Sequence, residues 1–163
     1  MSLDESDAMD PVDPVDVVAA VKRRLSRRPA LQVVPDARID LRSAEGAAAQ
    51  LLEALGLDLR DENVAGTPRR MVASLAEFLT PREFTLTTFP NDESYDELVI
   101  ARHIPFTSLC EHHMLPFTGV AAVGYLPGNR ILGLSKLARV VELFAHRPQV
   151  QERLTTQVAR WLD

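Results

Sequence analysis

The stretch from Leu98 to Leu126, LVIARHIPFTSLCEHHMLPFTGVAAVGYL, decides the fold of this chain. Its first part, Leu98–Phe106, is rich in Val, Ile and Phe, and Thr118–Leu126 forms a second apolar run. Such residue types favour β-strands, and the turn residues after Leu126 close the second run. We therefore expect two antiparallel strands connected by Thr107–Pro116, the segment that holds most of the unusual chemistry.

Helical periodicity lies on both sides of these strands. Ser43 is placed as the N-cap of a first helix ending at Gly56, and Thr67 as the N-cap of a second helix with Pro68 at its first position. After Gly133 the apolar period returns to that of a helix, in two further segments. Their apolar faces comprise Leu134, Leu137, Val140, Val141 and Phe144, then Val150, Leu154, Val158 and Trp161. The pattern predicts an α+β fold, in which helices back an antiparallel sheet.

Residues 1–42 differ in character from the rest. They begin strongly acidic and become strongly basic before two prolines interrupt any regular pattern. A short helix from about Val15 to Arg28 is expected, because Val17, Val18 and Val21 share one helical face. Charge runs are usually solvated, so we interpret 1–42 as a flexible or loosely docked extension and 43–163 as the folded domain.

Composition narrows the function classes. The chain has 163 residues, of which 46% are apolar and 25% charged, as expected of one folded domain. It contains no apolar run of the ~18 residues that a membrane span needs, and its acidic N-terminus lacks an export signal, so a cytoplasmic location is expected. The net charge of −5 argues against nucleic-acid binding, although a focused anion site remains possible.

The lone cysteine, Cys110, lies beside two histidines in Cys110-Glu111-His112-His113. Cys110 and His113 have the spacing that lets both side chains reach one Zn²⁺ from a tight loop. A neighbouring imidazolium would also lower the pKa of the thiol and activate it as a nucleophile. Spacing alone does not separate these two readings from a third, a structural cysteine beside surface histidines.

Further along, Gly133-Leu134-Ser135-Lys136 opens a helix with a hydroxyl and an ammonium group, and Arg139 shares the face of Lys136. Free N–H groups at a helix N-terminus favour anions, so this is a candidate polyphosphate site. A capping serine with two solvated bases is the alternative. Glu152 could accept from the N1–H and N2–H donors of guanine, or could simply complement a helix dipole.

Four motifs, in this order and spacing, resemble the GTP cyclohydrolase I family, zinc enzymes of the tunnelling fold. They are Thr67-Pro68-Arg69-Arg70, Ser108-Leu109-Cys110-Glu111-His112-His113, Gly133 to Arg139 and Arg147 to Leu154. The resemblance covers about 43–163. It implies zinc-dependent hydrolytic opening of the guanine imidazole ring of GTP, which yields formate and 7,8-dihydroneopterin triphosphate and begins tetrahydrofolate biosynthesis. It also implies a ring-shaped homo-oligomer with active sites between subunits.

The resemblance carries roles over to individual residues. Cys110 and His113 match two of three zinc ligands, and His112 matches a catalytic acid/base. The substrate contacts it implies are Ser135, Lys136, Arg139 and Arg70 for the triphosphate, with Gln151 and Glu152 for ribose and guanine.

Two departures from the family pattern stand out. Ala73 replaces a lysine that would contact the triphosphate. The family also continues with two more strands, carrying a His-x-Cys segment with a second catalytic histidine and the third zinc ligand. We therefore expect a C-terminally truncated member with only two of the four strands. The alternatives are a non-catalytic chain that binds nucleotide or docks on full-length subunits, and a thiol-dependent relative using Cys110.

Overall fold

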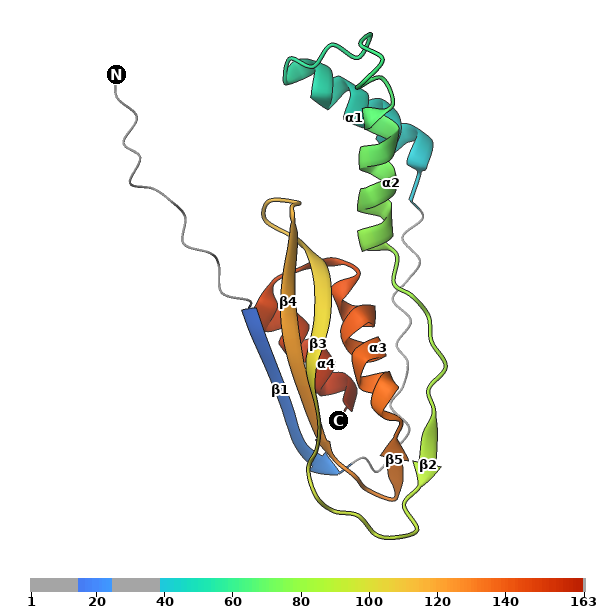
Figure 1. Cartoon of the computed structure of the whole chain (residues 1–163), viewed down its shortest axis with the longest axis vertical. Helices are drawn as coiled ribbons and strands as arrows, with labels where there is room; N and C mark the ends of the chain where they lie inside the picture. The colour runs from blue at the N-terminus through green and yellow to red at the C-terminus, as the bar shows by residue number, and fades with distance from the viewer. Residues whose placement is uncertain (1–14, 25–38, 163) are drawn as a thin grey trace, which may run out of the picture.

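The computed structural model describes residues 15–24, as backbone, and 39–162 (Figure 1). Its secondary structure is α+β, as expected. In chain order the elements are β1 (Val15–Arg24), α1 (Leu41–Ala54), α2 (Thr67–Leu79), β2 (Thr88–Pro90), β3 (Val99–Cys110), β4 (Pro116–Leu126), β5 (Arg130–Leu132), α3 (Leu134–Ala145), β6 (Pro148–Gln149) and α4 (Gln151–Leu162).

The predicted hairpin forms the centre of the main sheet. Strands β3 and β4 pair antiparallel from Val99↔Tyr125 to Leu109↔Pro116. Both strands run further than the sequence indicated, so the connection shrinks from Thr107–Pro116 to residues 111–115. The register shifts between Ala101 and Ile104, where His103 adopts a positive φ of 57°, as in a β-bulge. The hairpin therefore presents Cys110 at the very end of a strand.

The described part of the extension contradicts the helix expected over 15–28. Residues 15–24 form strand β1, which pairs parallel with β4 from Val15↔Gly119 onward. Valine is β-branched and favours strands over helices, and β4 offers an edge with unpaired backbone groups. Residues 25–28 of the expected helix lie outside the described residues.

The sheet is also not the two-stranded antiparallel one expected. Its four strands have the order β1-β4-β3-β6, and β6 pairs parallel with the end of β3. A separate two-stranded sheet joins β2 to β5. The expected strands were those with long apolar runs, and a strand of two residues, Pro148–Gln149, has no such run.

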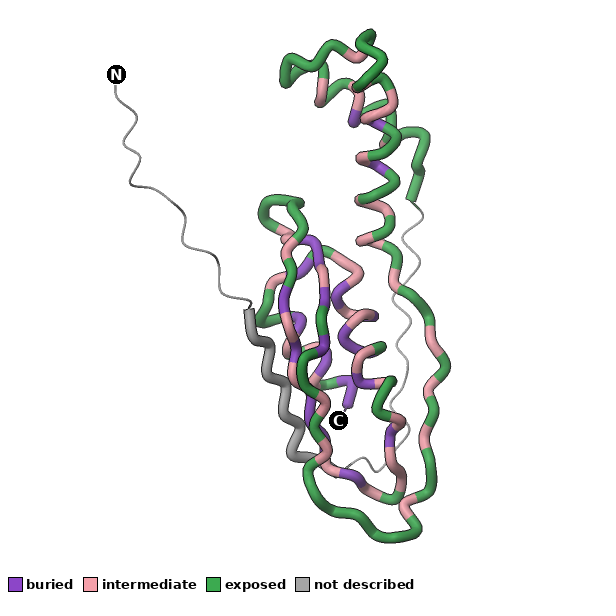
Figure 2. Tube along the Cα trace, viewed as in Figure 1, coloured by how far each residue is buried: buried purple, intermediate pink, exposed green. Residues whose placement is uncertain are grey.

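The hydrophobic core lies between one face of β3–β4 and the helices α3 and α4 (Figures 1 and 2). On β3, Ile104, Phe106 and Ser108 are buried in alternation with the more exposed Pro105 and Thr107, as on the inner face of a sheet, and Leu109 near the end of the strand is buried as well. The helices contribute most of the expected stripes, with Leu137, Val140, Leu154 and Val158 fully buried. Leu134, expected on the α3 stripe, is instead 62% exposed at the start of the helix, and Leu162, outside the expected stripe of α4, is fully buried.

Helices α1 and α2 pack on each other beyond the end of the sheet (Figure 1), and Ala48 of α1 and Val72 of α2 are buried. Two predicted caps were wrong by a few residues. Asp40, not Ser43, caps α1, and its carboxylate accepts from the backbone N–H of Ser43 at 3.0 Å. Gly66 is the N-cap of α2, so Thr67 is already the first helical residue.

Within the described ranges, 15–24 and 39–162, no helix combines the length and the apolar character needed to cross a membrane.

Candidate active site

The loop between β3 and β4 holds the two predicted metal ligands together. The backbone N–H of Met114 donates to the carbonyl of Cys110 at 2.8 Å, and the N–H of Cys110 donates to the carbonyl of Leu115 at 2.8 Å. Met114 takes a positive φ of 55°, which reverses the chain. The turn brings Sγ of Cys110 to 3.4 Å from Nδ1 of His113.

This pair is chemically suited to zinc. Tetrahedral zinc binds sulfur at ~2.3 Å and imidazole nitrogen at ~2.0–2.1 Å, bond lengths that separate two ligand atoms by about 3.5 Å. The observed 3.4 Å between Sγ and Nδ1 matches that separation. In the described part of the chain, no group of three or more His, Cys, Asp or Glu side chains is arranged to hold an ion. The loop therefore brings together two candidate ligands.

The protonation state of Cys110 also suits a ligand. Its pKa is lowered from 9.0 to about 7, chiefly by the hydrogen bond with the His113 side chain and further by the backbone N–H groups of His113 and His112. The thiolate is the form that binds metals and attacks electrophiles. A pKa near 7 leaves much of the thiol deprotonated at neutral pH.

His112 lies beside this pair, and its side chain contributes slightly to the lowered pKa of Cys110. Its side chain is 65% exposed, and its ring centre lies 6.2 Å from that of His113. Its Nε2 lies 3.9 Å from Oε1 of Glu111. An exposed imidazole beside a carboxylate can exchange protons with a ligand bound at the loop.

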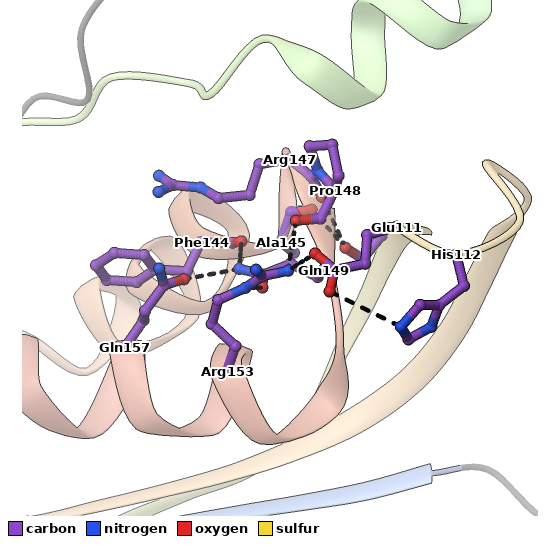
Figure 3. Close-up of polar contacts among 10 residues, drawn as sticks. Glu111, His112, Phe144, Ala145, Arg147, Pro148, Gln149, Arg153 and Gln157 are labelled. Atoms are coloured by element: carbon purple, nitrogen blue, oxygen red, sulfur yellow. Dashed lines mark hydrogen bonds and ion pairs between the residues drawn. The ribbon is translucent and has the colours of Figure 1, made fainter.

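The segment at the start of α4 is hydrogen-bonded to the same loop (Figure 3). Strand β6 pairs with the end of β3, and the N–H of Glu111 donates to the carbonyl of Gln149 at 3.1 Å. Helix α4 begins two residues later, so the exposed side chains of Gln151 and Glu152 lie at the loop end of the sheet. The structure thus brings the predicted metal ligands and the predicted guanine contacts to one end of the fold.

The predicted triphosphate residues of α3 lie elsewhere. Helix α3 ends beside the loop, where Ser108 Oγ donates to the carbonyl of Ala145 at 2.7 Å. Ser135 and Lys136 stand at its opposite end, about 15 Å away along the helix axis at 1.5 Å per residue. Gly133, not Ser135, is the N-cap, and the capping reading of Ser135 was wrong. Lys136 Nζ lies 6.0 Å above the ring of Phe84.

Arg139 and Arg70 both have contacts within the chain. Arg139 pairs with Glu142 at 2.8 Å, and Glu142 also pairs with Arg82 at 3.2 Å. Arg70 lies near the start of α2, where its guanidinium donates to Thr67 Oγ1 at 3.0 Å. Neither arginine reaches the loop at Cys110 through any contact between described residues. One copy of the chain therefore does not assemble all the predicted site residues.

A cleft of about 610 Å³ lies between the end of α2, strand β3 and helix α3. Its walls combine apolar groups with the Arg82–Glu142 ion pair. The other lining residues include Phe78, Ile104, Phe106, Ala138 and His146. Arg139 lies one helical turn before Glu142, which lines the cleft, and pairs with it.

Sequence reasoning missed the contacts that join the loop to α4. Arg153 binds the Glu111 carboxylate, and its Nε donates to Oε1 of the buried Gln149 at 3.0 Å. These three residues were inside the motifs already singled out. No sequence signal pointed to these contacts, because the burial of Gln149, which requires partners for its amide, is visible only in the structure.

Comparison with known proteins identifies the family. The sequence model described as GTP cyclohydrolase I matches residues 44–163. A protein of Sulfurihydrogenibium sp. (strain YO3AOP1) named GTP cyclohydrolase 1 is 47% identical over 125 residues, which cover 77% of this chain and 67% of that protein. Proteins of the same name from Mycolicibacterium gilvum (strain PYR-GCK) and Mycobacterium tuberculosis (strain ATCC 25177 / H37Ra) are also 47% identical.

The matched regions cover 83% and 74% of this chain and 69% and 62% of those two relatives. The chain thus spans about two thirds of the length of the curated relatives it matches. A family model matching most of the chain and relatives near one-half identity lead to one conclusion: this chain belongs to the GTP cyclohydrolase I family.

Proposed function

We propose that the chain acts in the zinc-dependent hydrolytic opening of the imidazole ring of GTP, which releases formate and gives 7,8-dihydroneopterin triphosphate at the start of tetrahydrofolate biosynthesis. The observation that carries this proposal is the Cys110–His113 pair, separated by 3.4 Å, at the same end of the fold as Glu152. Family membership supplies the reaction class. The fold we propose is the tunnelling fold, with 43–163 as the family domain and 1–42 as an extension.

The metal, held by Cys110 and His113, would supply Lewis acidity that activates water near neutral pH. His112 would give a proton to N7 of guanine, a role supported by its exposed ring beside the pair. Glu152 would accept from N1–H and N2–H and so select guanine over adenine. Gln151 would contact the ribose. Catalytic zinc normally has three protein ligands, so we propose that a third lies outside the residues described here.

The triphosphate carries several negative charges and requires paired bases. Ser135, Lys136, Arg139 and Arg70 are the residues proposed for it. Ser135 and Lys136 lie at the far end of α3 from Cys110 and the loop of residues 111–115 that follows it, which together we call the metal loop. This separation supports a homo-oligomer in which one copy supplies the metal loop and another supplies these groups. We propose a cytoplasmic location, because a free thiol ligand persists in a reducing compartment.

The decisive experiment measures zinc content and GTP-dependent formate release on protein of verified intact mass. We expect bound zinc and formate that both depend on Cys110, with C110S as the variant. No zinc and no formate, together with co-purification of an intact homologue, would favour the non-catalytic alternative instead. Alkylation of Cys110 that zinc fails to prevent would favour the thiol-dependent one.

Shared sites can be tested by mixing inactive variants. C110S lacks a metal ligand and Lys136→Ala lacks a triphosphate contact, so each alone should be inactive. If the two residues serve one site from different copies, mixed assemblies contain some intact sites and regain activity. Mixed assemblies that stay inactive, while each variant still assembles, would count against sites between subunits.

A further inference from the structure

Arg153 lies at the centre of a polar cluster that the proposed chemistry does not use. Its guanidinium binds the Glu111 carboxylate from the loop, and Nε donates to Oε1 of Gln149 at 3.0 Å (Figure 3). A further N–H donates to the carbonyl of Pro148 at 3.3 Å. One side chain of α4 thus contacts both the loop after Cys110 and strand β6.

Gln149 is the residue in this cluster whose orientation is fixed by its surroundings. The residue is fully buried, and its Nε2 donates to the carbonyl of Phe144 at 2.7 Å and to Oε1 of Gln157 at 2.7 Å. All these partners belong to α3 or α4. A buried amide with all these groups satisfied has one favourable orientation, so its Oε1 presents a fixed acceptor to Arg153.

Glu111 connects Arg153 to the loop. One carboxylate oxygen binds Arg153, and the other lies 3.9 Å from Nε2 of His112. Glu111 also stands next to Cys110 in sequence. Without a cation, this acid would be free to swing toward the metal ligands beside it. Arg153 holds it on the side of α4.

We propose that Arg153 is a positioning residue that fixes the metal loop, through Glu111, against the N-terminal turn of α4 carrying Gln151 and Glu152. This inference rests on the proposed function, since it takes Glu152 as the group that recognises guanine. Its consequence is selectivity. If the contact between the loop and α4 is lost, Glu152 moves relative to the guanine base, whose imidazole ring lies at the loop.

The test compares Arg153→Gln and Glu111→Gln with Arg160→Gln. Arg160 is an exposed arginine in the last turn of the same helix, so its variant makes the same charge change as the first, far from the loop. The first readout is the ratio of the dissociation constants for ATP and GTP, measured by equilibrium dialysis on the zinc-loaded full chain. A general loss of structure weakens both nucleotides, whereas misplacement of Glu152 lowers the preference for GTP.

The second readout needs no nucleotide. It is hydrogen exchange of the Glu111 amide, whose bond to the Gln149 carbonyl joins the loop to β6. We expect R153Q and E111Q to lower the GTP preference about tenfold, the scale typical of lost outer-shell partners. Exchange of the amide should accelerate about threefold. Adding E111Q to R153Q should change little further, since R153Q has already removed the Arg153–Glu111 contact. Arg153→Lys should restore part of both effects.

The inference is overturned if R153Q exchanges the Glu111 amide as slowly as R160Q does. It is also overturned if R153Q binds GTP and ATP with the wild-type ratio. A wild-type chain that binds GTP no better than ATP would overturn the proposed function and the selectivity role together. The exchange measurement would then still decide whether Arg153 holds the loop.

Discussion

Sγ of Cys110 lies 3.4 Å from Nδ1 of His113, across a reversal of the chain at the end of strand β3. The two residues are three positions apart, yet the turn faces them toward each other before any metal is considered. The imidazole is the main cause of the lowered pKa of the thiol. A preformed pair spares the ordering entropy that metal binding would otherwise require.

The first prediction concerns the pH dependence of Cys110 in metal-free protein. Because its pKa is lowered to about 7, the rate of alkylation by iodoacetamide should rise with pH and reach half its maximum near 7, instead of near the ordinary 9.0. His113→Ala removes the leading cause and should move the midpoint upward. His112→Ala, which removes a smaller contribution, should move it less. Equal shifts in the two variants would contradict this ranking.

The second prediction separates metal binding from proton transfer. C110S should lose zinc and, with it, formate release. His112→Ala should retain zinc, because its ring lies outside the Cys110–His113 pair, while formate release falls by a factor of about 10² to 10⁴, the usual worth of a positioned acid or base. Metal analysis and a formate assay on the same samples check both. Loss of zinc from the His112 variant would instead make this histidine a ligand.

Residue patterns predicted the centre of the fold well. Two long apolar runs around a polar segment gave the β3–β4 hairpin, and the stripes of α3 and α4 gave the core-facing helices. These elements are decided by local periodicity and burial, which sequence expresses directly. The candidate ligands Cys110 and His113 were predicted for the same reason, because their proximity depends on one tight turn.

The failures arose where pairing decides structure. The valines of β1 share a helical face, yet the strand is set by the backbone edge of β4, a partner about a hundred residues away. Strand β6 and the Glu111–Arg153 contact likewise join segments distant in sequence. The positions of Arg70, Ser135 and Lys136 relative to the loop depend on packing and, under the proposed function, on a second copy of the chain.

The third prediction tests a buried hydrogen-bonding hydroxyl. Tyr125 is fully buried; its hydroxyl accepts from the N–H of Leu132 at 2.9 Å and donates to the carbonyl of Leu132 at 3.1 Å. Tyr125→Phe leaves both backbone groups without this partner and should cost about 1–3 kcal/mol of unfolding free energy. Urea denaturation measures the loss. Tyr95→Phe, at a residue 54% exposed, is the matched control and should stay within about 0.5 kcal/mol of the wild type.

The fourth prediction concerns the arginine that we propose for the triphosphate. Glu142 holds Arg139 at 2.8 Å and also pairs with Arg82 at 3.2 Å. Glu142→Gln removes the anion that competes with phosphate for Arg139. At low salt the variant should bind GTP about twofold more tightly, equivalent to about 0.4 kcal/mol, a typical value for an exposed ion pair.

Arg82→Gln is the matched control for this substitution. It leaves Glu142 to Arg139 alone, so GTP should bind no more tightly than to the wild type. Calorimetric titration at two salt concentrations measures both variants, and the gain for E142Q should shrink as salt screens the charges. Weaker binding of GTP by E142Q would show that Glu142 orients Arg139 for the ligand instead of competing with it.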